Sequence, residues 1–87
     1  MSDTSYRIEI SRRAGKDIAT LTPKLKQKLK GILANQIAVA PYGGKKLVGE
    51  LAGYWSVRLT HRDRIVYRID EGNGVVFILR ARTHYQP

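Results

Sequence analysis

Three segments in the C-terminal half of this chain alternate apolar and polar side chains, and this two-residue period constrains the fold more than any other feature. The segments cover residues 54–60, 64–70 and 75–85. Short turn sequences separate them, HRD in the first gap and EGNG in the second, and the second is rich in residues that tolerate positive φ. The pattern predicts an antiparallel sheet built from consecutive hairpins.

The N-terminal half predicts one strand and two helices. YRIEI (residues 6–10) alternates as a strand does, and Ser11 is a good N-cap for the helix that follows. Thr22 and Pro23 begin a second helix, whose apolar stripe runs to about Val39. A short strand at KKLVGEL completes the order β-α-α-β-β-β-β. The chain is therefore predicted to form a single α+β domain over residues 1–87, with a twisted antiparallel sheet and both helices on one face.

Composition excludes several classes of protein. The chain has no cysteine, which rules out a disulfide scaffold and a thiolate metal site and suits a reducing cytoplasm. It has no 18-residue apolar run, and its N-terminus lacks the pattern of a secretion signal. Two histidines without clustered acids, and no glycine-rich phosphate loop, predict neither a metal site nor a cofactor.

The charge balance indicates which kinds of partner the chain could bind. Sixteen Lys and Arg against seven Asp and Glu give a net charge of +9 on 87 residues. Such an excess predicts a polyanionic partner, which is a nucleic acid, an acidic protein or an anionic membrane surface. Charge alone does not separate these from a basic surface that serves solubility.

The sheet face turned away from the predicted helices collects basic side chains from three adjacent strands. Alternation places six residues there: Arg58, Arg64, Arg68, Arg80, Arg82 and His84. The same alternation turns four residues of the last strand toward the core: Val75, Phe77, Leu79 and Ala81. Like charges on paired strands destabilise a sheet, so a bound anion explains this cluster better, and the guanidinium fork suits phosphate. We expect a phosphate or nucleic-acid site, with an ordinary solvated sheet face as the alternative.

The aromatic and histidine residues near this face differ in what they predict. Trp55 falls on the core face and is expected to pack rather than to stack on a base. His61 lies in the HRD turn and is expected to be solvated, whereas His84 ends an arginine-lined strand and can transfer a proton near neutral pH. Tyr85 adds a phenol, but strict alternation turns it away from His84.

Taken together, the order of elements, the segment GELAGYWSVRLTHRDRIVYRID and the ending FILRARTHY resemble the RelE/ParE superfamily of toxin–antitoxin toxins, closest to its RelE and YoeB/Txe branch. The resemblance spans nearly the whole chain and is strongest over residues 47–85, in the patterns L-x-G-x-W-S-x-R, R-x-V-Y and H-Y. It implies a ribosome-dependent endoribonuclease that inhibits translation by cutting mRNA in the ribosomal A site. The ribose 2′-OH attacks the adjacent phosphate without a metal, and an acidic antitoxin neutralises the toxin.

The resemblance also implies roles for particular residues. Arg64 matches the arginine that holds the scissile phosphate, and Arg58 a basic residue that neutralises the phosphate or supports the base. His84 matches the general acid toward the leaving 5′-oxygen, and Tyr85 a tyrosine that orients the base or phosphate. Contacts with mRNA or rRNA are expected from six further residues: Lys45, Lys46, Arg62, Arg68, Arg80 and Arg82.

The general base is not assigned by this resemblance. Lys45 stands where the YoeB-like branch has a glutamate, and Ser56 where the RelE-like branch has a lysine. Glu50 is the nearest carboxylate and is the candidate base, although it could equally pair with Arg58. Lys45 and Lys46 suit either contact with rRNA or activation of the 2′-OH.

Two other functions compete with the nuclease. ParE-like members share the fold but inhibit DNA gyrase, and they generally lack the matched arginine and the terminal His-Tyr pair. A non-catalytic basic RNA-binding module is the third possibility. Cleavage of ribosome-bound message separates the nuclease from both.

Overall fold

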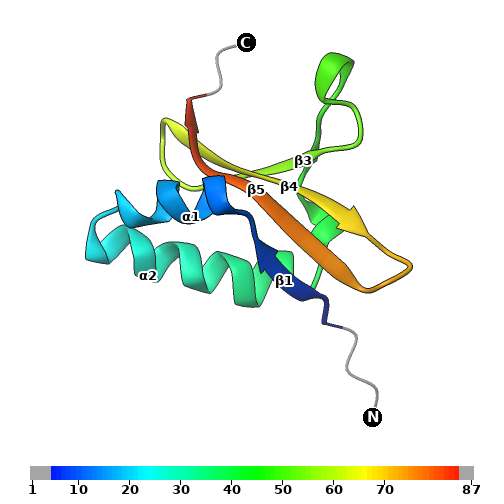
Figure 1. Ribbon diagram of the computed structural model, residues 1–87, viewed down its shortest axis with the longest axis horizontal. Coiled ribbons are helices and arrows are strands. Elements are labelled where there is room, and N and C mark those ends of the chain that lie inside the picture. Colours follow the sequence, from blue (N-terminus) through cyan, green and yellow to red (C-terminus); the bar gives the residue numbers. More distant parts are fainter. Residues whose placement is uncertain (1–4, 85–87) are drawn as a thin grey trace.

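The structure, a computed structural model, describes the backbone of residues 5–84 and the side chains of residues 5–82, and it shows two helices packed against one sheet (Figure 1). The helices are α1 (Arg12–Ala19) and α2 (Pro23–Ile32), and α2 continues into a π-helical turn (Leu33–Ile37). The strands are β1 (Arg7–Ile10), β2 (Lys45–Lys46), β3 (Trp55–Arg58), β4 (Asp63–Asp70) and β5 (Val75–His84). Two short 3-10 turns, Pro41–Gly43 and Gly49–Leu51, flank β2. The α+β prediction is confirmed.

The sheet is mixed rather than wholly antiparallel. Its strand order is β1-β5-β4-β3-β2, and the four C-terminal strands pair antiparallel as the hairpin turns predict. β1 instead lies parallel to β5, with Arg7 beside Val75. The prediction was wrong for this strand because no hairpin joins β1 to its neighbour. Alternation within a strand reports its faces and not its direction.

Local sequence signals set both helix starts. The Ala14 N–H donates to Ser11 Oγ at 3.0 Å, and the Leu25 N–H donates to Thr22 Oγ1 at 3.2 Å. These caps satisfy backbone donors that a helix N-terminus otherwise leaves unpaired. Ser11 Oγ also donates to the Leu79 carbonyl at 3.1 Å, which ties the start of α1 to β5. In the described part of the chain, no helix has the length and apolar character needed to cross a bilayer.

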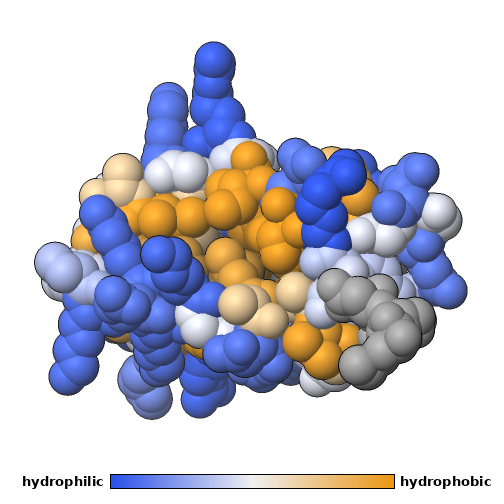
Figure 2. Space-filling view, turned by 90° about the horizontal axis from the view of Figure 1, so that it is seen from below, coloured by the Kyte–Doolittle hydropathy of each residue, from blue (hydrophilic) through white to orange (hydrophobic). Residues whose placement is uncertain are grey.

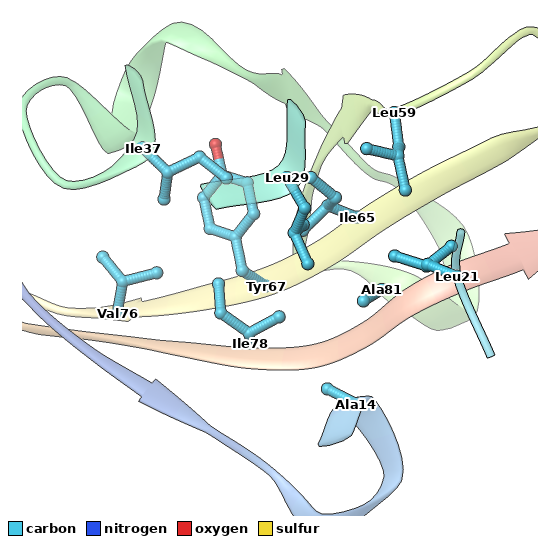
Figure 3. Packing of buried hydrophobic residues seen from close by; sticks show 10 residues of the cluster. All are labelled: Ala14, Leu21, Leu29, Ile37, Leu59, Ile65, Tyr67, Val76, Ile78 and Ala81. Carbon is cyan, nitrogen blue, oxygen red and sulfur yellow. The ribbon is translucent and has the colours of Figure 1, made fainter. Parts of the chain in front are cut away.

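The core lies between the helices and one face of the sheet (Figure 3). Its buried members are Ala14, Leu21, Leu29, Ile37, Leu59, Ile65, Tyr67, Val76, Ile78 and Ala81. Tyr67 is its largest side chain, and its hydroxyl donates to the Pro41 carbonyl at 2.6 Å. Burial raises the pKa of Tyr67 to about 12. Trp55 is half-buried against this cluster, which confirms that it packs.

β5 departs from the regular alternation that its sequence predicts. Val76 and Ile78 are fully buried in the core, whereas Phe77 is half-exposed beside Arg68 on the other face. Tyr67 pairs with Ile78, but the preceding residue of β4 pairs with Arg80, so the register shifts between them. A bulge of this kind inserts an extra residue into one strand and reverses the faces on its two sides. The predicted assignment of Phe77 to the core was wrong for this reason.

Candidate nucleic-acid interface

Two arginines face each other across the hairpin that joins β3 to β4. Arg58, the last residue of β3, pairs directly with Arg64 of β4. Arg58 is exposed and Arg64 is half-buried. Within residues 5–82 neither guanidinium forms an ion pair or a side-chain hydrogen bond. Two like charges therefore lie opposite each other on paired strands, an arrangement that destabilises a sheet and that a bound anion would relieve.

The turn between these arginines is fixed by Thr60 and Asp63. The Thr60 hydroxyl accepts the N–H groups of Arg62 at 3.1 Å and Asp63 at 2.9 Å, and it donates to Asp63 Oδ2 at 3.2 Å. The Asp63 carbonyl accepts the Leu59 N–H at 2.9 Å. His61 and Arg62 project from this turn and are exposed, as expected for His61. The turn thus holds the Arg58–Arg64 pair in register while it presents Arg62 to solvent.

Arg80 and Arg82 turn toward α1 and not toward the open sheet face, so the predicted six-residue face was wrong for them. Arg80 Nε and Nη2 donate to the Asp17 carboxylate at 2.8 and 3.3 Å, and the Ala81 N–H donates to the same carboxylate at 3.1 Å. Arg82 Nη1 donates to the carbonyl and hydroxyl of Thr20 at 3.0 and 3.1 Å. Both guanidinium groups are therefore engaged by α1 and its C-cap residue Thr20.

The Asp17–Arg80 contact shifts both ionisations. Burial alone would raise the pKa of Asp17, but hydrogen bonds from Arg80 and the Ala81 N–H, together with the Arg80 charge, outweigh it and lower the pKa below 3.8. The same hydrogen bond raises the pKa of Arg80. Both groups stay charged, and they anchor the second half of β5 to α1.

Arg68 occupies a separate part of the sheet. Its guanidinium carbon lies 4.4 Å from the centre of the Phe77 ring, a cation–π contact. It lies four positions after Arg64 on β4, a distance of roughly 13 Å along a strand. Arg68 is exposed and could contact a nucleic acid there, but it does not join the Arg58–Arg64 pair.

The candidate residues before β3 lie toward the start of that strand, whereas Arg58 lies at its end. Lys45 pairs with Ser56 and Lys46 with Trp55, so Lys45 is the nearer in register to Arg58. Both lysines are exposed. Glu50 is exposed in the Gly49–Leu51 turn, within a loop that rises from the start of β3, and Arg58 lies at the other end of that strand (Figure 1). The structure gives Glu50 no ion pair with Arg58.

The end of β5 has a register that its sequence did not reveal. Thr83 pairs with Arg64, and His84 pairs with Asp63. The side chain of His84 lies outside the described residues, so its expected place beside Arg64 stays a prediction. Tyr85 lies outside the described residues.

Sequence reasoning missed Asp63, which it treated as a turn residue. Asp63 is only 6% exposed, and its Oδ1 has no hydrogen-bond partner among the described residues. Its Oδ2 lies 3.7 Å from Arg82 Nε. A lone acid inside the basic stretch HRDR was the available signal. The described residues hold no group of three or more His, Cys, Asp or Glu side chains that could bind a metal ion.

These features define a small α+β protein of the RelE/YoeB toxin branch, with Arg58 and Arg64 opposite each other at one end of its sheet. Residues 22–85 match the family described as the YoeB-like toxin of bacterial type II toxin–antitoxin systems, and the chain belongs to that family. Toxin YoeB of Mycobacterium bovis is 42% identical over 57 residues. That match covers 61% of this chain and 65% of the relative, so it spans slightly less than two thirds of the relative's length.

Solved structures agree with this assignment. The RelBE2 toxin–antitoxin complex of Mycobacterium tuberculosis contains a chain with a TM-score of 0.83 and 30% identity, covering 93% of this chain and 99% of that one. The YoeB–YefM complex of Staphylococcus aureus gives a TM-score of 0.66 and 29% identity, with 92% and 98% covered. The intact RelBE complex of E. coli, at 19% identity and a TM-score of 0.76 over 94% of this chain and 100% of that one, supports the fold alone.

Proposed function

We propose that this chain is the toxin of a toxin–antitoxin pair and acts as a ribosome-dependent endoribonuclease that cuts mRNA in the ribosomal A site. The observation that carries the proposal is the Arg58–Arg64 pair, two arginines opposite each other on neighbouring strands without an acidic partner in the described residues. A phosphate between them would relieve their repulsion, and a phosphate that gains charge during reaction would be held more strongly still. Family membership supports RNA as the source of that phosphate.

The proposed reaction is an internal transfer at phosphorus. The ribose 2′-oxygen forms a bond to the adjacent phosphorus while the bond from phosphorus to the 5′-oxygen breaks, which leaves a cyclic phosphate and a 5′-OH. Arg64, with Arg58, stabilises the charge on the phosphoryl oxygens. His84 gives a proton to the leaving 5′-oxygen, and Tyr85 orients the base or phosphate. The scheme needs no metal or cofactor, and the group that takes the 2′-OH proton is not assigned.

The exposed basic residues around this pair suit contacts with the ribosome and the message. Arg62 is exposed in the turn between the two arginines, Lys45 and Lys46 are exposed on the neighbouring strand β2, and Arg68 lies further along β4. Lysine and arginine contacts to phosphates add affinity without base specificity, and they weaken as salt is raised. A ribosomal substrate places the activity in the cytoplasm.

The helix side of the molecule suits the second partner, an acidic antitoxin. A groove of about 460 Å³ lies among α1, α2 and β1, lined by Ile10, Ile18, Pro23, Lys26, Gln27, Leu29, Lys30 and Leu33. Figure 2 shows apolar residues gathered in the middle of this face with hydrophilic residues around them. An amphipathic segment with acidic flanks would fill the groove and meet its lysines. The antitoxin chains in the related complexes support a partner of this kind.

Primer extension on mRNA in a reconstituted translating ribosome tests the nuclease. New stops should appear within A-site codons, and naked RNA should stay intact. Arg64→Ala should lower cleavage by roughly 10²–10³-fold, the usual cost of losing one group that stabilises developing charge. Arg13→Ala is the matched control, since Arg13 is exposed on α1 and its loss changes the net charge equally.

Three results would contradict the proposal. Equal cleavage by wild type and Arg64→Ala would remove Arg64 from the mechanism. No stops, together with inhibition of gyrase supercoiling, would establish the ParE-like activity instead. Ribosome or RNA binding by a folded protein without cleavage would make the chain a binding module.

A further inference from the structure

We propose that Arg68 and Phe77 form a stacking site for an unpaired base of the RNA strand, a few nucleotides from the phosphate held at Arg64. The inference deepens the proposed function and rests on it for the identity of the strand. Stacking itself is a property of the isolated protein, so it can be measured without ribosomes and without cleavage.

The first observation is an aromatic ring on the open face of the sheet, the face turned away from the helices. Val76 and Ile78 lie on either side of Phe77 in β5, and both are fully buried in the core. Phe77 is half-exposed and does not belong to the core cluster of the described residues. A ring that is left partly in water gives up stabilisation that full burial would provide, and it offers a surface on which a base can stack.

The second observation is the guanidinium group above this ring. Arg68 pairs with Phe77 across β4 and β5, and its guanidinium carbon lies 4.4 Å from the ring centre. Arg68 is exposed, and within the described residues it forms no ion pair or side-chain hydrogen bond. Asp70, the next residue along this face, is hydrogen-bonded to Asn73 instead. The outer side of the guanidinium is therefore free for a base, and guanidinium planes and aromatic rings are the groups on which proteins stack unpaired RNA bases.

The third observation is that this site continues the surface on which the phosphate is proposed to bind. The core side chains of β4 alternate with Arg64, Val66 and Arg68, so these three share the open face. The apolar Val66 lies between the two arginines on this strand, and no acid separates them. A stacked nucleic-acid strand rises about 3.4 Å per nucleotide, so a strand held at Arg64 covers the roughly 13 Å to Arg68 within about four nucleotides. One RNA strand can therefore contact both arginines.

Such a site would hold the message in place without reading its sequence, because every base has a π-face. It also differs from a phosphate contact in its response to salt. Contacts with phosphates release counterions and weaken as salt is raised, whereas stacking does not depend on the phosphate charge. Loss of stacking alone should therefore weaken binding by a similar factor at every salt concentration.

Fluorescence of a short single-stranded 2′-O-methyl RNA tests the stacking. The probe carries 2-aminopurine at each position in turn, since this adenine analogue loses fluorescence when it stacks. Wild type should quench at least one probe. Phe77→Leu and Arg68→Lys, which keep the charge, should each remove most of that quenching and weaken binding by roughly fivefold or more, with an unchanged salt dependence. Arg13→Lys, on the exposed surface of α1, is the matched control and should behave as wild type.

The same assay supplies the results that would overturn the proposal. Quenching and affinity equal to those of wild type in both variants would remove the site. A comparison with abasic RNA of equal length needs no variant, so it decides the matter even if Phe77→Leu fails to fold. Wild type should bind the abasic strand more weakly, and Arg68→Lys should bind that strand as wild type does. Equal wild-type affinity for the two strands would overturn the proposal.

The ribosomal assay separates this inference from the nuclease. If wild type cleaves the message, Arg68→Lys should need more toxin for half-maximal cleavage and should keep the maximal rate, because the stacked base is distant from the reacting phosphate. Quenching by a wild type that does not cleave would contradict the nuclease and leave the stacking site standing. Cleavage by a wild type that quenches no probe would overturn the stacking site and leave the nuclease standing.

Discussion

At position 44 the core, rather than a turn, requires glycine. A Cβ added there would fall on the Tyr67 hydroxyl and lie 2.9 Å from the Ser56 carbonyl oxygen. The ring of Tyr67 is fully buried and is held by its hydrogen bond to Pro41, so it cannot move aside. Gly44→Ala should therefore lower the free energy of unfolding by about 1–3 kcal/mol, the usual cost of overpacking.

The neighbouring glycine supplies the matched control for urea unfolding. A Cβ at Gly43 meets nothing within 4 Å, and its φ is not positive. Gly43→Ala should leave stability unchanged or raise it slightly, because it restricts the unfolded chain. Equal losses in both variants would show that the loop backbone, and not the contact with Tyr67, requires glycine.

At the scale of elements, sequence reasoning succeeded where the determinants are local. The caps at Ser11 and Thr22 follow from residues three positions apart, and the arginine pair follows from the short β3–β4 hairpin. It failed in β5, because a bulge changes which side chains face the core and the alternation of apolar and polar residues does not show where the bulge lies. The Asp17–Arg80 contact could not be predicted because it joins residues 63 positions apart in the sequence. The role of Asp63 could not be predicted because its contact with Arg82 joins two different strands.

The contact between Asp17 and Arg80, which anchors β5 to α1, predicts how the free energy of unfolding depends on pH. Folding lowers the pKa of Asp17 below its ordinary value of 3.8. The ionised carboxylate therefore stabilises the folded state above about pH 3.8, and this stabilisation is lost as the pH falls through the folded pKa. Asp17→Asn should cost about 2 kcal/mol at pH 7, because it leaves the donors of Arg80 poorly matched. The difference from wild type should shrink as pH falls below about 4.

Urea unfolding between pH 3 and pH 7 measures this difference. Glu9→Gln is the control, because its partner Arg7 is 70% exposed in the side chain and an exposed ion pair contributes little. A difference between Asp17→Asn and wild type that is independent of pH would show that the carboxylate charge does not hold β5.

At the scale of the whole molecule, the +9 charge is divided between two surfaces with different proposed partners. The Arg58–Arg64 pair lies at one end of the sheet, and the apolar groove with Lys26 and Lys30 lies among the helices and β1. If each surface has its own partner, substitutions should separate the two activities. The double variant Lys26→Glu, Lys30→Glu should weaken binding of the cognate acidic antitoxin by at least tenfold at low salt while it leaves ribosomal cleavage in place.

The matched control reverses the same charges elsewhere on α2. Lys24 and Lys28 are exposed on this helix but do not line the groove, so Lys24→Glu, Lys28→Glu should weaken the antitoxin far less. The gap between the antitoxin affinities of the two double variants should persist as salt is raised, since screening removes the long-range attraction that both variants change equally but not the local contacts of the groove. Arg64→Ala should show the opposite pattern, with cleavage lost and antitoxin affinity kept. Equal weakening by both lysine pairs would mean that net charge, rather than the groove, recruits the antitoxin.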